Sequence, residues 1–104
     1  MRRVLWSPLG LTLYERDVLD YLETQGESAM RRVRSDIDWA IQLLAQRPIG
    51  RPARISGTYE KGVVGQPYII AYTLLPRDDG EADDLLIMRI VHTSRDWPPG
   101  GWPR

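Results

Sequence analysis

The chain has 104 residues, of which 42% are hydrophobic and 27% charged, and this composition is typical of one globular domain and excludes a disordered chain. Fourteen basic residues balance fourteen acidic ones, so the chain as a whole exerts no strong attraction on a polyphosphate. It contains no cysteine and one histidine, which excludes disulfides and thiolate metal sites and argues against a zinc enzyme.

Neither a membrane span nor a secretory leader is predicted. The longest apolar runs, at 68–75 and 85–91, are far shorter than the roughly 20 residues that a bilayer span needs. Near the N-terminus, Pro8 and Gly10 arrive before an apolar leader segment could form. Because the lack of cysteine also permits a reducing compartment, we expect a cytoplasmic protein with no membrane partner.

The first elements are predicted to be a strand and a helix. An apolar run at 4–6 indicates a strand at about residues 2–7. Apolar residues then recur at spacings of three and four, which is typical of one helix face: Leu11, Tyr14, Val18, Tyr21 and Leu22. The helix begins either at Ser7 with Pro8 or at a capping box of Thr12 with Glu15, and the pattern leaves both starts open.

A second helix follows after a short loop. Gly26 is expected to close the first helix, and Ser28 is placed to cap the second. Pro48 and Gly50 end the second helix. Its apolar stripe consists of Met30, Val33, Ile37, Ala40, Ile41 and Leu44. Two helices joined by so short a loop are expected to run antiparallel.

The remainder of the chain predicts strands. The period changes to two or to continuous apolar runs at 53–60, 67–75 and 84–92. The segment 76–83, with Asp79 and Gly80 at its centre, is predicted to be a solvated hairpin loop.

The predicted fold class is therefore α+β, with an antiparallel sheet covered by an α-helical hairpin and the order β-α-α-β-β-β. Residues 1–97 are expected to form a single domain. Residues 98–104, rich in proline and glycine, are expected to leave it as an extended tail.

The candidate functional cluster lies at the end of the last predicted strand. It consists of Arg89, His92, Arg95, Asp96 and Trp97. Strict alternation places Arg89 on the face of Leu85 and Ile87, where it either ends the buried part of the sheet or lines a surface that binds an anion or a partner.

Each member of this cluster has a structural and a functional interpretation. His92 could act as a general acid or base, or it could simply be hydrogen-bonded at a strand end. Arg95 and Asp96 could form a surface ion pair, and Trp97 could close the core. The chain has no glycine-rich phosphate loop, so no nucleotide cofactor is predicted. With no cysteine and one histidine, no metal site is predicted either.

A second group of basic residues surrounds the end of the second helix, where it forms either a binding patch or a solvated face. Its members are Arg31, Arg32, Arg34, Arg47, Arg51 and Arg54.

Short strings along almost the whole chain resemble the ParE/RelE superfamily of toxins, and the ParE branch most closely. They are Trp6-Ser7-Pro8, Tyr21-Leu22, Gly50-Arg51-Pro52, residues 55–60 and 67–72, and residues 88–92 with Arg95-Asp96-Trp97. Their order matches the order of elements derived above from the apolar pattern.

The resemblance implies the toxin of a type II toxin-antitoxin system, of the kind associated with plasmid stabilization and growth arrest. Such a toxin forms a heteromeric complex with a cognate antitoxin that neutralises it. ParE-like members inhibit DNA gyrase and so block replication. RelE-like members are endonucleases that cut mRNA on the ribosome, which is the alternative function for this chain.

One position separates these two functions. The nuclease relatives typically carry an arginine in the third strand, just after the position of Tyr68, where this chain has Ile69. A nuclease without this arginine lacks a positive charge that would stabilise the scissile phosphate. We therefore expect a gyrase inhibitor without catalytic residues of its own, with His92 and Arg89 as the catalytic candidates if the chain is a nuclease.

Overall fold

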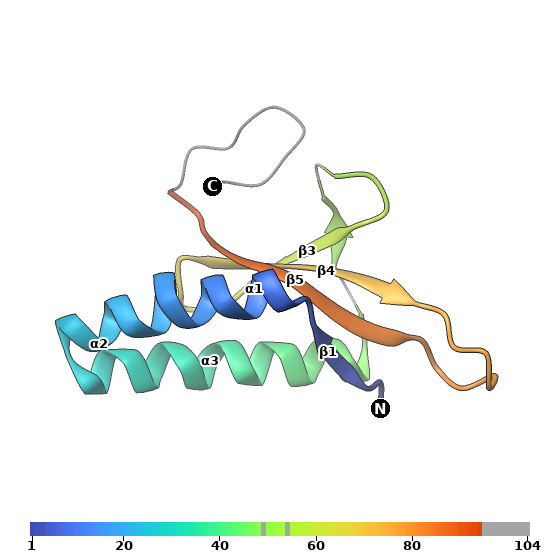
Figure 1. Cartoon of the computed structure of the whole chain (residues 1–104), viewed down its shortest axis with the longest axis horizontal. Helices are drawn as coiled ribbons and strands as arrows, with labels where there is room; N and C mark the ends of the chain where they lie inside the picture. The colour runs from blue at the N-terminus through green and yellow to red at the C-terminus, as the bar shows by residue number, and fades with distance from the viewer. Residues whose placement is uncertain (49, 54, 95–104) are drawn as a thin grey trace.

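The computed structural model describes residues 1–48, 50–53 and 55–94, and its helices and strands form two layers (Figure 1). One layer is a sheet with the strand order β1-β5-β4-β3-β2. A helical hairpin covers one face of the sheet, so the predicted α+β class is confirmed. The elements are β1 (Val4–Trp6), α1 (Pro8–Leu13), the π-helix η1 (Tyr14–Asp20), α2 (Tyr21–Gln25), α3 (Glu27–Gln46), β2 (Arg51–Pro52), β3 (Tyr59–Gly62), β4 (Tyr68–Leu75) and β5 (Asp84–His92).

The sheet is mixed, whereas the sequence predicted antiparallel pairing throughout. β1 runs parallel to β5, with Val4 opposite Leu85 and Trp6 opposite Ile87. The pairs β2–β3, β3–β4 and β4–β5 are antiparallel. An apolar pattern reports that a segment is a strand but not which neighbour it joins, so the direction of β1 could not be read from it.

The first arm of the helical hairpin consists of α1, η1 and α2. It begins at Pro8 with Ser7 as its cap. The Gly10 backbone N–H donates to Ser7 Oγ at 3.0 Å, and Ser7 Oγ donates to the Met88 carbonyl at 3.2 Å. This selects the first of the two predicted starts over the capping box of Thr12.

The turn between the two arms also departs from one expectation. Gly26 ends α2 as predicted, but it also caps α3, which begins at Glu27. The expectation that Ser28 caps the second helix is therefore wrong. Gly26 has a φ of 149°, a conformation that glycine adopts without steric cost, and it reverses the chain within one residue.

The strand predicted at 53–60 is wrong in its bounds. β2 ends before it at Pro52, and β3 begins only at Tyr59, after a turn. Thr58 N–H donates to the Ile55 carbonyl at 3.2 Å, and Gly57 has a φ of 82°. The left-handed conformation of Gly57 is that of a turn, so the glycine outweighs the strand preference of its β-branched neighbours.

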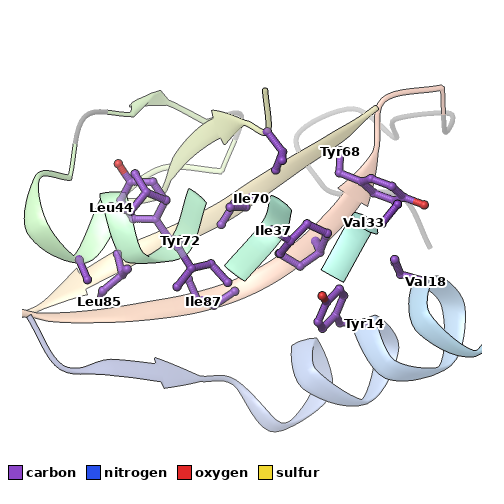
Figure 2. Close-up of a cluster of buried hydrophobic side chains, with 14 residues drawn as sticks. Tyr14, Val18, Val33, Ile37, Leu44, Tyr68, Ile70, Tyr72, Leu85 and Ile87 are labelled. Atoms are coloured by element: carbon purple, nitrogen blue, oxygen red, sulfur yellow. The ribbon is translucent and has the colours of Figure 1, made fainter. Parts of the chain in front are cut away.

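The core lies between α3 and the central strands (Figure 2). The apolar stripe predicted for the second helix faces the sheet, with Val33, Ile37 and Leu44 buried. From the sheet, Tyr68, Ile70, Tyr72, Leu85 and Ile87 pack against it. Burial of this apolar surface is what holds the hairpin on the sheet.

A β-bulge in β5 changes which residues face the core. The register with β4 shifts at Ala71 and Tyr72, so that Tyr72 lies opposite Ile87 and Ala71 opposite Arg89. One extra residue in β5, Met88, shifts the alternation, and Ile87 and Ile90 both pack in the core. The expected alternation is therefore wrong beyond Ile87, and Arg89 does not share a face with Leu85 and Ile87.

An ion pair fixes the N-terminus to the start of β5. Arg3 donates to Asp84 from Nε at 3.1 Å and from Nη2 at 2.6 Å. Asp84 is only 5% exposed, and the Arg3 guanidinium holds the pKa of its carboxyl below the ordinary value, although burial opposes this shift. The bidentate geometry makes this pair stronger than an isolated surface pair.

Asp84→Asn is expected to destabilise the protein at neutral pH and much less in acid. A carboxyl whose pKa is lowered in the folded state contributes stability above its unfolded pKa of about 3.9 and loses it as the pH falls through the folded pKa. Urea unfolding near pH 7 and at about pH 3 measures this difference between the two proteins. Asp20→Asn, which removes an exposed carboxylate, is the control. An equal deficit of Asp84→Asn at both pH values would contradict the ion-pair assignment.

Candidate functional site

A groove of about 580 Å³ lies between the first helical arm and the C-terminal end of β5. Its volume is within the roughly 300–1,000 Å³ that is usual for ligand pockets. Arg16, Asp17 and Tyr21 line it on the helical side, and Arg89, His92 and Ser94 on the strand side. Val18, Tyr68 and Ile90, which are buried, also line it and make its inner part apolar.

The groove exists because β1 is short. β1 pairs with β5 only as far as Trp6 opposite Ile87, after which Ser7 and Pro8 turn the chain into α1. At Gly10 the helix lies so close to β5 that an added Cβ would overlap the Met88 carbonyl oxygen. Beyond this contact the groove separates the helical arm from the strand.

The helical wall of the groove is a π-helix. η1 spans the seven residues Tyr14–Asp20, and π-helical turns are wider than α-helical ones and frequent at functional sites. Tyr14 and Val18 of η1 are buried. Arg16 and Asp17 line the groove and form an ion pair with 2.8 Å between Arg16 Nε and Asp17 Oδ1.

The geometry around His92 fixes its tautomer. The Ser94 backbone N–H donates to His92 Nδ1 at 3.1 Å, and Ser94 Oγ lies 2.7 Å from the same nitrogen. Since a backbone N–H can only donate, Nδ1 is the acceptor and the neutral ring carries its proton on Nε2. The ring also meets Tyr68 edge to face, with centroids 5.2 Å apart. His92 is thus held as a hydrogen-bond donor through Nε2.

Two of the predicted site residues, Arg89 and His92, line the same groove. The other three, Arg95, Asp96 and Trp97, lie outside the described residues. Prediction from sequence missed Arg16, Asp17, Tyr21 and Ser94. The three helical residues lie about seventy positions from β5 in the sequence, and nothing in their local pattern connects them with it.

The second basic group is partly neutralised. Arg31 pairs with Glu27 at 2.5 Å, one helical turn away, and Arg51 pairs with Glu60 at 2.9 Å. Arg54 lies outside the described residues. The pairing and exposure of these side chains favour the interpretation as a solvated face.

The described residues offer neither a metal site nor a membrane span. Within residues 1–48, 50–53 and 55–94, no three His, Asp or Glu side chains gather closely enough to hold a metal ion. In the same part of the chain, no helix has the length and apolar character to cross a membrane.

The described side chains that line the groove carry more positive than negative charge. Arg16 and Arg89 are the two guanidinium groups, and the neutral His92 ring carries its proton on Nε2. Among the described residues that line the groove, Asp17 carries the single carboxylate. An anionic group in contact with an apolar or aromatic one fits this arrangement.

Comparisons with known proteins agree with the fold. The family described as ParE toxin of type II toxin-antitoxin system, parDE, matches residues 15–97. A solved structure titled "Chromosomal ParDE TA system from P. aeruginosa" is similar, with a TM-score of 0.71 and 17% identity over 90% of this chain and 98% of that chain. No curated protein matches the chain.

Proposed function

Because this chain belongs to the ParE toxin family of type II toxin-antitoxin systems, we propose that it arrests growth by inhibiting DNA gyrase and that a cognate antitoxin neutralises it. The family membership is the observation that carries the proposal. The likeness to the structure of the chromosomal ParDE toxin-antitoxin system from P. aeruginosa supports the fold of the chain.

The groove supports a protein target over RNA cleavage. A general base at His92 would need a free ring nitrogen, but Nδ1 accepts from Ser94 and Nε2 holds the proton. Ile69 lies in β4 between Gly62 and Val91 of the neighbouring strands. An isoleucine there supplies no charge to a scissile phosphate, at the position where nuclease relatives typically carry arginine.

The gyrase-binding surface that we propose lies at the end of β5. Arg89 and His92 line its groove, and Arg95, Asp96 and Trp97 continue the chain beyond the described part. Arginine and tryptophan are the residue types that contribute most at protein interfaces. Charge on such a surface sets the orientation and the rate of binding to the partner.

Purified gyrase with relaxed plasmid DNA and ATP tests the target directly. Addition of the toxin is expected to reduce the supercoiled product in proportion to its concentration, and prior addition of the antitoxin is expected to restore it. The protein with both Arg89 and Trp97 replaced by alanine, confirmed as folded by circular dichroism, is expected to inhibit much less. Arg32→Ala, an exposed change on α3, is the matched control.

A different outcome would favour the ribonuclease function. His92 and Arg89 line one groove, as a nuclease that transfers a proton and stabilises a phosphate would require. If gyrase is unaffected while translation in a reconstituted extract stops, the gyrase proposal is wrong. His92→Ala would then be expected to abolish mRNA cleavage and to leave ribosome binding intact.

A further inference from the structure

The outer face of α3 carries two large apolar side chains that stay exposed in the folded chain. Trp39 is 67% exposed and Leu43 is 46% exposed, and the two lie one helical turn apart on the same side of the helix. At 3.6 residues per turn this side points away from Ile37, which is buried in the core (Figure 2). Tryptophan is highly buried on average in folded proteins, so an exposed Trp–Leu pair indicates a surface on which another molecule packs.

Opposite charges flank this pair along α3. Asp36 lies one turn before Trp39, and Arg47, the C-cap residue, follows Leu43 by four positions. Asp36 Oδ2 accepts from Gln66 Nε2 at 2.9 Å, and a carboxylate can accept several further hydrogen bonds. The Arg47 side chain is exposed. The outer face of α3 therefore runs from an acid through two apolar residues to a base.

A face with this order is complementary to itself when two copies pack with their helices antiparallel. A twofold axis that passes between Trp39 and Leu43 places Trp39 of each copy on Leu43 of the other copy. The same register brings Asp36 of each copy beside Arg47 of the other, because both pairs are centred on nearly the same point of the helix. Two apolar contacts and two ion pairs thus form in a single arrangement.

The basic residues around this face permit the arrangement. Arg31 pairs with Glu27 and Arg51 pairs with Glu60 within the chain, which reduces the repulsion between two copies. A nucleic acid fits the face less well, because an acid and two apolar side chains stand among its cations. A second copy of the chain supplies each complementary group at the required spacing.

From this geometry we propose that the chain forms a homodimer through the outer faces of its two α3 helices. Trp39 packs on Leu43 of the second copy, and Asp36 pairs with Arg47 of the second copy. One pair of helices buries a small area, as in transient complexes, so we expect a dissociation constant on the order of tens of micromolar. The described residues that line the groove belong to other elements than α3, so the inference does not depend on the proposed function of the groove.

Sedimentation equilibrium of the full chain without antitoxin, over about 1–500 µM, tests the proposal. The average mass is expected to rise from that of one chain toward that of two. Trp39→Ala is expected to weaken the association about tenfold or more, as the loss of a central aromatic side chain does at interfaces. Leu75→Ala, which removes an exposed apolar side chain on β4, is the matched control and is expected to leave the association unchanged. Unfolding measured at about 1 µM, well below the dissociation constant, compares single chains.

Exchange of the two charges tests the register. Asp36→Lys places two cations in each contact, and Arg47→Glu places two carboxylates there, so each variant alone is expected to associate about tenfold or more weakly than the wild-type chain. In an equimolar mixture of the two variants, the mixed dimer contains both ion pairs with their charges matched. The mixture is therefore expected to regain the affinity of the wild-type chain. Circular dichroism confirms that each variant is folded.

Three results would overturn the proposal. The first is a chain that stays monomeric up to about 500 µM; if Trp39→Ala then weakens binding of the antitoxin, the face belongs to the antitoxin instead. The second is a dimer with an affinity that Trp39→Ala leaves unchanged, because such a dimer uses another face. The third is a mixture of the folded charge variants that associates no more tightly than either variant alone.

Discussion

Ile37→Ala is expected to lower the free energy of unfolding by about 2–5 kcal/mol, the usual cost of truncating a fully buried aliphatic side chain. Ile37 has 0% exposure and lies on α3 in the core cluster with Tyr14, Tyr68 and Ile70 (Figure 2). Since a domain of this size has a total stability of about 5–15 kcal/mol, one such loss brings the protein close to unfolding. Urea denaturation followed by circular dichroism measures the change.

Trp39→Ala is the matched control. Trp39 lies two residues along the same helix and is 67% exposed, so its loss is expected to change stability by no more than about 0.5 kcal/mol. A deficit in Trp39→Ala as large as that of Ile37→Ala would mean that α3 presents a different face to the sheet. It would also mean that the helical wall of the groove lies elsewhere, because the first helical arm, which forms that wall, packs on α3.

Gly10→Ala is expected to destabilise the protein by about 1–3 kcal/mol, the range typical of overpacking. In an ordinary helix position the same change stabilises by up to about 1 kcal/mol, because alanine has the higher helix propensity. Here the new Cβ would overlap the Met88 carbonyl oxygen and crowd Ser7 Oγ at 2.6 Å. The carbonyl belongs to the backbone of β5 and cannot rotate away, so the helix must move.

The sign of the effect makes this prediction informative. Thr12→Ala, at an exposed position of the same helix, is expected to be neutral or slightly stabilising by propensity alone. A gain in stability for Gly10→Ala would show that α1 does not approach β5 as described. Because η1 continues directly from α1, a displaced helix would also change the width of the groove.

The apolar pattern was sufficient for the class of the fold. Spacings of three and four identified the helical hairpin, and Val33, Ile37 and Leu44 of the predicted stripe are buried. The long runs at 67–75 and 84–92 became β4 and β5. Such patterns are reliable because each element must bury one face, whatever its neighbours are.

Near the turns, single residues and distant contacts decided what the apolar pattern left open or placed wrongly. Ser7 was one of two possible caps, and its hydrogen bond to the Met88 carbonyl depends on a strand eighty residues away. Gly57 forms a turn inside a segment that propensity alone favoured as strand. In both places a single turn residue or a distant contact outweighed the average preference of the segment.

The sequence by itself determined the α+β class, the family and the candidate residues Arg89 and His92, because periodicity and local motifs are properties of neighbouring residues. Only the tertiary structure decided which face Arg89 occupies, since the bulge at Met88 depends on pairing with β4. It also brought Arg16 and Asp17 beside His92. No local pattern encodes such a meeting, because residues far apart in the chain come together only when the core packs.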